Sequence, residues 1–88
     1  MSHAVTWTAT ATRALQRLPD KVATPAIEFI YRSLAENPQR VGKPLRFELE
    51  GLHSARRGDY RVVYEIDQTE ATVTIIAIQH RADVYRQR

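Results

Sequence analysis

Residues 52–66 of this 88-residue chain restrict its fold more than any other segment, because they predict two strands joined by a tight turn. Gly58 and Asp59 interrupt the run, and both residue types favour turns. From residue 60 to residue 66, apolar side chains then alternate with others at a period of two. One face of this strand therefore carries large apolar side chains only, and they are Tyr60, Val62, Tyr64 and Ile66. Such a face has to be covered by other parts of the chain.

The other elements near the two ends of the chain follow from similar patterns. Residues 71–79 have the composition of a buried strand, so residues 52–79 predict three consecutive antiparallel strands. Residues 4–8 predict a short first strand. Thr8 or Thr10 can cap the helix that follows. Apolar residues recur in that helix at helical spacing, at Ala11, Ala14, Leu15 and Leu18.

A second helix is expected to begin at Pro19-Asp20 and to run to about residue 36, where Asn37-Pro38 stops it. Pro25 lies inside this helix. It either bends one continuous helix, which is the interpretation we favour, or marks a later start with Thr24 as the cap. Residues 39–52 are expected to be irregular. The order β-α-α-β-β-β predicts an α+β fold, in which a helical hairpin packs on a small, mainly antiparallel four-stranded sheet.

The length of the chain allows one domain, residues 1–88, with a modest core. We therefore expect any functional site to be a groove on the surface. The sequence has no cysteine, so neither a disulfide nor a thiolate metal site is possible. The three histidines are too scattered to predict a metal site, and no cofactor is expected. Neither a signal peptide nor a membrane-spanning run is visible, which predicts a soluble cytoplasmic protein without a membrane partner.

Positive charge is concentrated in the middle of the chain. The net charge is +3 and the sequence pI is about 9.7. Residues 40–61 hold three acidic side chains, Glu48, Glu50 and Asp59, against twice as many basic ones. The basic residues are Arg40, Lys43, Arg46, Arg56, Arg57 and Arg61. This balance favours an acidic partner, above all a phosphodiester, although solvated charge on an ordinary surface gives the same count.

Several motifs carry a resemblance to a known family. Gly58-Asp59-Tyr60-Arg61-Val62-Val63-Tyr64 is followed by His80-Arg81 and then by Val84-Tyr85-Arg86. With Trp7-Thr8 and Leu15-Gln16-Arg17-Leu18-Pro19 near the start, the chain resembles the RelE/ParE toxin superfamily over nearly its whole length. The resemblance implies a microbial RNase-like fold and a toxin of a bacterial type II toxin–antitoxin system. RelE-type members cut messenger RNA in the ribosomal A site, whereas ParE-type members poison DNA gyrase. This sequence is more similar to the RelE branch.

The resemblance also implies roles for individual residues in a metal-independent cleavage of RNA. Arg61 and Arg81 match the phosphate-binding arginines of RelE, and Arg56 matches a further basic residue on the preceding strand. Tyr85 matches a tyrosine that stacks on or orients a base. His80 is the candidate for proton transfer, because histidine is the side chain that ordinarily titrates near neutral pH. Contacts with the RNA backbone are expected from three more residues, Arg57, Lys43 and Arg46.

Each of these roles has a structural alternative. Arg61 can instead form a surface salt bridge with Glu65 or Asp67. His80 can be a solvated histidine at the end of a strand, and Tyr85 can pack on the rim of the sheet.

One departure from the RelE pattern keeps other functions open. RelE-type sites often carry lysines on the strand before the turn, where this chain has Leu52 and Ser54. The second hypothesis is therefore a gyrase inhibitor that acts through protein contact without nuclease activity. A third is an antitoxin-bound module with negligible toxicity that tunes transcription.

The resemblance predicts the partners as well. They are a cognate antitoxin and the ribosome with messenger RNA in its A site. The complex with the antitoxin is expected to bind operator DNA through the antitoxin. We expect the antitoxin to cover an apolar groove near Phe29, Tyr31 and Phe47, although aromatic residues of this kind are more often part of a core.

Overall fold

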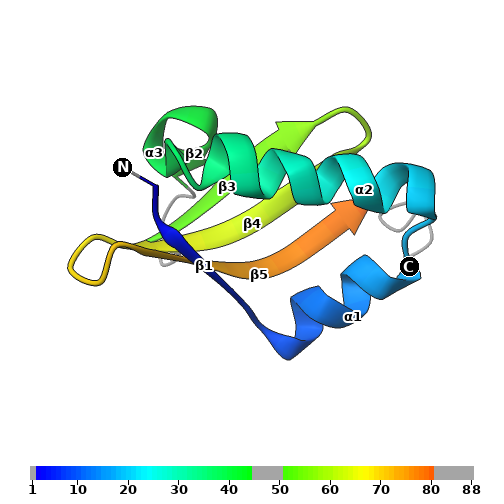
Figure 1. Ribbon diagram of the computed structural model, residues 1–88, viewed down its shortest axis with the longest axis horizontal. Helices are drawn as coiled ribbons and strands as arrows, with labels where there is room; N and C mark the ends of the chain where they lie inside the picture. Colours follow the sequence, from blue (N-terminus) through cyan, green and yellow to red (C-terminus); the bar gives the residue numbers. More distant parts are fainter. Residues whose placement is uncertain (1, 45–50, 81–88) are drawn as a thin grey trace.

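The computed structural model describes residues 2–44 and 51–80, which form one five-stranded sheet with helices packed against it (Figure 1). The strands are β1 (Ala4–Trp7), β2 (Lys43–Pro44), β3 (Leu52–Arg57), β4 (Tyr60–Asp67) and β5 (Thr72–His80). Their order in the sheet is β1-β5-β4-β3-β2. β1 pairs with β5 in parallel, and the other neighbours are antiparallel. The predicted α+β class and the mainly antiparallel sheet are confirmed.

β2 is the strand that the sequence analysis did not predict, because residues 39–52 were expected to be irregular. The sheet therefore has five strands instead of four. β2 is two residues long and lies at the edge of the sheet, with Pro44 opposite His53 of β3. Proline lacks the N–H that a central strand needs, so an edge position suits it. Two residues are too few to produce an alternating pattern that sequence reasoning can detect.

The helices follow the predicted order. α1 (Ala9–Arg17) is capped by Thr8, whose hydroxyl accepts a 3.1 Å hydrogen bond from the Ala11 N–H. α2 (Asp20–Glu28) passes through Pro25 and continues directly as a π-helical segment, η1 (Phe29–Leu34), so the preferred continuous helix is confirmed. A further single turn, α3 (Pro38–Val41), follows it. Within residues 2–44 and 51–80, every helix is too short or too polar to cross a membrane.

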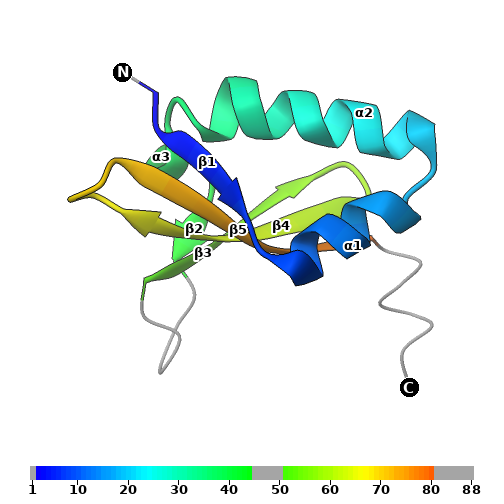
Figure 2. The same cartoon turned by 60° about the horizontal axis from the view of Figure 1, so that its bottom comes forward.

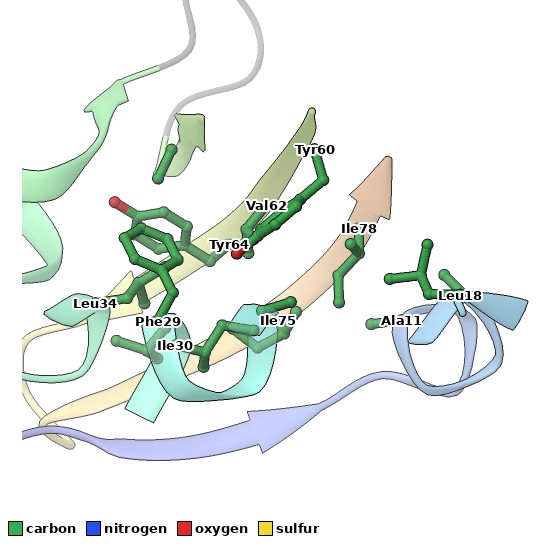
Figure 3. Packing of buried hydrophobic residues seen from close by; sticks show 14 residues of the cluster. Ala11, Leu18, Phe29, Ile30, Leu34, Tyr60, Val62, Tyr64, Ile75 and Ile78 are labelled. Carbon is green, nitrogen blue, oxygen red and sulfur yellow. The ribbon is translucent and has the colours of Figure 1, made fainter. Parts of the chain in front are cut away.

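The core lies between the sheet and the long helix formed by α2 and η1. Figure 2 shows this helix on one side of the sheet, while α1 follows β1 and packs beside β5. Phe29, Ile30 and Leu34 from η1 are buried against the apolar face of β4 and β5 (Figure 3). The side chains of Val62 and Tyr64 on β4 are fully buried, as the alternation in the sequence predicted.

Tyr64 connects the centre of this core to the chain that leads into β2. Its ring is fully buried, and its hydroxyl donates a hydrogen bond to the carbonyl oxygen of Pro38 in α3. Gly42 packs directly against the same hydroxyl. A Cβ atom at Gly42 would also lie 2.8 Å from the Ser54 carbonyl oxygen, which is too close for any side chain. The position of β2 therefore depends on a tyrosine in β4 and on the absence of a side chain at residue 42.

Replacing the two buried tyrosines of β4 by phenylalanine should affect stability differently. Tyr64→Phe leaves the Pro38 carbonyl without its partner and should lower the free energy of unfolding by about 1–2 kcal/mol. The Tyr60 hydroxyl is buried and has no hydrogen-bond partner among the described residues, so Tyr60→Phe should be neutral or stabilising by up to about 1 kcal/mol. Urea denaturation of the two variants beside the wild type measures both effects. An equal loss in both would contradict the assigned hydrogen bond.

The stability of the domain should fall in strongly alkaline solution because of Tyr64. Burial raises the pKa of Tyr64 from 10.0 to about 12, so the folded state favours the neutral phenol. The corresponding stability is complete below pH 10 and is lost as the pH rises towards 12. A shift of this size corresponds to roughly 2–3 kcal/mol.

The measurement is the free energy of unfolding between pH 9 and pH 12. It is best made with Tyr60→Phe as the reference protein, because burial also raises the pKa of Tyr60, against a smaller lowering by Arg57. Adding Tyr64→Phe to that protein should flatten the decline. Parallel declines with and without Tyr64 would show that another group is responsible.

Candidate functional site

The face of the sheet opposite α2, here called the outer face, carries Arg56 of β3 and Arg61, Glu65 and Asp67 of β4. Residues paired in register on neighbouring strands point to the same face. Arg56 of β3 is paired with Arg61 of β4, and Arg61 is paired with Gln79 of β5. All three side chains are exposed. They form one row across three strands near the β3–β4 turn.

Arg61 is held in this row by Gln79. Its Nη2–H donates a 2.9 Å hydrogen bond to the Gln79 Oε1, and its Nε–H donates a 3.3 Å hydrogen bond to the same oxygen. The predicted alternative, an ion pair with Glu65 or Asp67, is not the contact that the structure gives Arg61. Glu65 lies four residues along the same strand, which corresponds to about 13 Å. Gln79 is a residue that the sequence analysis missed, although pairing β4 with β5 in the correct register would have found it.

Lys43 lies on the same face as these arginines. It is paired with Ser54, which is two residues from Arg56 along β3 and therefore shares its face. Lys43, Arg56 and Arg61, the basic cluster, thus bring together three predicted site residues from three strands. Leu52 and Ser54, at the positions where the RelE pattern often has lysine, are also on this face.

The structure places Arg57 and His80 on the opposite face. Tyr60, which belongs to the core, is paired in register with Arg57 on one side and with His80 on the other. The Arg57 guanidinium lies over the ring of Phe29, with 5.4 Å between its Cζ atom and the ring centroid. His80 is half-buried at the end of β5. The strand alternation therefore separates these two residues from the basic cluster, although they are close to it along the chain.

The remaining predicted site residues fall in other parts of the chain. Arg46, Arg81 and Tyr85 lie outside the described residues. Phe47, one of the three aromatic residues predicted near the antitoxin, lies outside them as well. Of the other two, Phe29 belongs to the core, whereas Tyr31 is half exposed and its hydroxyl accepts a 3.0 Å hydrogen bond from the Trp7 indole N–H.

The electrostatics of the outer face favour an anion at one end of the sheet. Arg61 lies at the β3–β4 turn, whereas Glu65 and Asp67 lie towards the other end of β4. Arginine suits a phosphate because its planar guanidinium can hold two oxygens and stays charged. In the part of the chain that the structure describes, no three histidine, aspartate or glutamate side chains gather into a group that could hold a metal ion. The arrangement is suited to binding a phosphodiester through cationic side chains.

Comparisons with known proteins agree on one family. The family described as the ParE toxin of the type II toxin-antitoxin system, parDE, matches residues 5–85. Toxin RelE of Mycobacterium tuberculosis (strain ATCC 25618 / H37Rv) is 61% identical over 79 residues, which are 90% of this chain and 81% of that protein. Toxin RelG of the same organism is 49% identical over 86 residues, covering 98% of this chain and 99% of that protein.

Solved structures show the same relationship. A chain in the crystal structure of the toxin-antitoxin complex RelBE2 from Mycobacterium tuberculosis has a TM-score of 0.89 and 46% identity, with 92% of this chain and 100% of that chain covered. The isolated RelE toxin of E. coli has a TM-score of 0.74 and 16% identity, covering 98% of this chain and 94% of that chain, and shares the fold.

The two neighbouring arginines of β3 should respond differently to substitution by alanine. Arg57→Ala removes the contact with Phe29 and should lower the free energy of unfolding by roughly 0.5–1 kcal/mol. Arg56→Ala removes a positive charge opposite Arg61, so it should leave the stability unchanged or raise it slightly. Thermal denaturation of both variants at low ionic strength tests this difference. A larger loss for Arg56→Ala than for Arg57→Ala would contradict the assignment of the two faces.

Proposed function

The chain belongs to the RelE/ParE family of toxins of type II toxin–antitoxin systems, and we propose that it inhibits translation by cutting messenger RNA on the ribosome. In this proposal the protein acts in the cytoplasm and is neutralised by a cognate antitoxin.

The observation that carries the proposal is the basic cluster on the outer face. Lys43, Arg56 and Arg61 come from three adjacent strands of one sheet, so their Cα positions are fixed relative to one another. Cations on three adjacent strands form a positively charged strip that can follow the backbone of a single RNA strand. In a chain of this size, the ribosome would supply most of the positioning of the substrate.

The proposed reaction is an attack by the ribose 2′-hydroxyl on the adjacent phosphorus. The P–O5′ bond breaks, and the products are a 2′,3′-cyclic phosphate, or the 3′-phosphate formed from it by hydrolysis, and a 5′-hydroxyl. The charge that develops on the phosphorane oxygens needs cationic donors. We assign this task to Arg61, which lies on the outer face, together with Arg81 on the basis of the family resemblance.

The proposal also assigns proton transfer and base contact. A group must take the proton of the 2′-hydroxyl and another must protonate the leaving 5′-oxygen. His80 is the proposed group for one of these steps, at the end of β5. Because its register pairs it with Tyr60 and not with Arg61, the scissile phosphate would have to lie over the end of the strand for His80 to reach it. Tyr85 is proposed to orient a base, and Arg57 and Arg46 to contact the RNA backbone less directly.

The proposed antitoxin is supported by the relatives in solved structures. The RelBE2 structure from Mycobacterium tuberculosis and the RelE–RelB structure from Pyrococcus horikoshii are both complexes of a toxin with its antitoxin. We extend this to a cognate antitoxin for the present chain, and to binding of operator DNA by the complex through the antitoxin.

A gyrase inhibitor remains the second candidate, and one observation favours it. Leu52 and Ser54 lie on the outer face beside Arg56 and Arg61, where neither side chain can replace a lysine in catalysis. A toxin of this family that acts through contact with gyrase needs no catalytic groups there. Double-strand DNA breaks with intact messenger RNA would identify that activity.

The test is primer extension on a defined messenger RNA in a bacterial cell-free translation reaction, with and without the purified protein. We expect cuts within the A-site codon that appear only on translated message. Arg61→Ala combined with Arg81→Ala should reduce cleavage by at least about 100-fold, because stabilisation of the phosphorane charge is lost.

Arg13→Ala, which removes an exposed arginine from α1, is the matched control and should cut like the wild type. If the messenger RNA stays intact at protein concentrations that arrest bacterial growth, the nuclease hypothesis is refuted and the gyrase inhibitor becomes the favoured function. Full cleavage by the double variant would instead refute the assigned arginines.

A further inference from the structure

The contact between Arg61 and Gln79 has a geometry that leaves one defined edge of the guanidinium available. A guanidinium has five N–H donors. Gln79 Oε1 accepts from Nε and from Nη2, which together form the side edge of the group. The donors left are the two on Nη1 and the second one on Nη2. One N–H of Nη1 and the remaining N–H of Nη2 form the end edge, which can bind two oxygens of one phosphate side by side.

The chemistry of the residue at position 79 matters as much as its position. Arg56 and Arg61 are directly opposite each other, and like charges in such a pair are destabilising. A carboxylate at residue 79 would relieve this repulsion but would also cancel the charge of Arg61. The neutral amide of Gln79 accepts from Arg61 and leaves both positive charges in place. Arg61 is therefore held by a contact that does not neutralise either arginine of the row.

The gain from this contact is orientation. A long arginine side chain on an exposed strand samples many rotamers, and ordering it for a reaction costs free energy. A hydrogen-bond acceptor on the neighbouring strand restricts these rotamers before the substrate binds, so less conformational entropy is lost on binding. Gln79 itself is exposed and makes no contribution to the buried core. Its replacement is therefore expected to change the behaviour of Arg61 without unfolding the domain.

We propose that Gln79 is the positioning residue for Arg61, and that it turns the end edge of the guanidinium towards the phosphate that is attacked. The inference rests on the proposed RNA cleavage. It assigns to Gln79 no contact with the substrate, only the orientation of the group that makes the contact.

The first measurement is the contact itself, in the complete protein. Gln79→Met keeps the length of the side chain and removes the acceptor. Gln68→Met makes the same chemical change in the turn between β4 and β5, at the other end of the sheet, and is the matched control. In ¹⁵N NMR spectra, exchange of the Arg61 Nε–H with water should be slow in the wild type and in Gln68→Met, and several-fold faster in Gln79→Met. Equal exchange in all three proteins would overturn the contact and the proposal with it.

The second measurement is the rate of message cleavage on programmed ribosomes. Gln79→Met should lower kcat by about tenfold and change KM by less than about twofold, because orientation is lost while the charge remains. Combining Gln79→Met with Arg61→Ala should cut no more slowly than Arg61→Ala alone, since the second residue acts only through the first. Unchanged melting temperatures exclude a loss of folded protein.

The outcomes separate this inference from the proposed function. Active wild-type protein with equally active Gln79→Met would overturn the positioning role alone. The positioning role would also be overturned if the losses in cleavage rate multiplied in the double variant, because Gln79 would then act independently of Arg61. Wild-type protein that cuts no message would overturn the proposed function, and the positioning role in cleavage with it.

Discussion

The alternation of side chains along β4 is the constraint on which the rest of the structure depends. Every second residue from Tyr60 to Tyr64 is buried against the long helix, and Arg61 between them points to the outer face. Because β4 lies in the middle of the described sheet, its two neighbours have to follow the same division into faces. The hydrogen bond from the Tyr64 hydroxyl to the Pro38 carbonyl oxygen also connects β4 to α3, which leads into the edge strand β2. The packing of the core thus also decides which charged groups share the outer face.

The two faces of β3 use arginine differently. Arg56 and Arg61 are paired directly, an arrangement that ordinary selection for stability would avoid. Arg57, the neighbour of Arg56 in β3, is stabilising, because its guanidinium lies over the Phe29 ring on the covered face of the sheet. Two consecutive arginines therefore lie on opposite faces of the sheet, Arg56 in the basic cluster and Arg57 against the helix, where it is proposed to contact RNA less directly. Gln79 completes the outer row without neutralising it.

Sequence reasoning succeeded where a local pattern controls the structure and failed where a non-local contact does. The Thr8 cap and the continuous helix through Pro25 both follow from neighbours in the chain. The π-helical segment, Phe29–Leu34, was not predicted, because the residue types in it do not distinguish it from an α-helix. His80 and Arg61 were both predicted as site residues, and only the register shows that they lie on different faces at the same end of the sheet. Gln79 was missed for the same reason, since only the register shows that it faces Arg61.

The sequence by itself determined the α+β class, the apolar face of β4, the family, and the placement of Arg61 on the opposite face. These depend on periodicity and on motifs, which are properties of neighbouring residues. The tertiary structure decided that Lys43 joins Arg56 and Arg61, and that Gln79 binds Arg61. Their strands are separated by turns and by residues 45–50, and the pairing register between strands arises only when the sheet assembles on its core. One residue of slip would exchange the two faces, which is why no single strand carries that information.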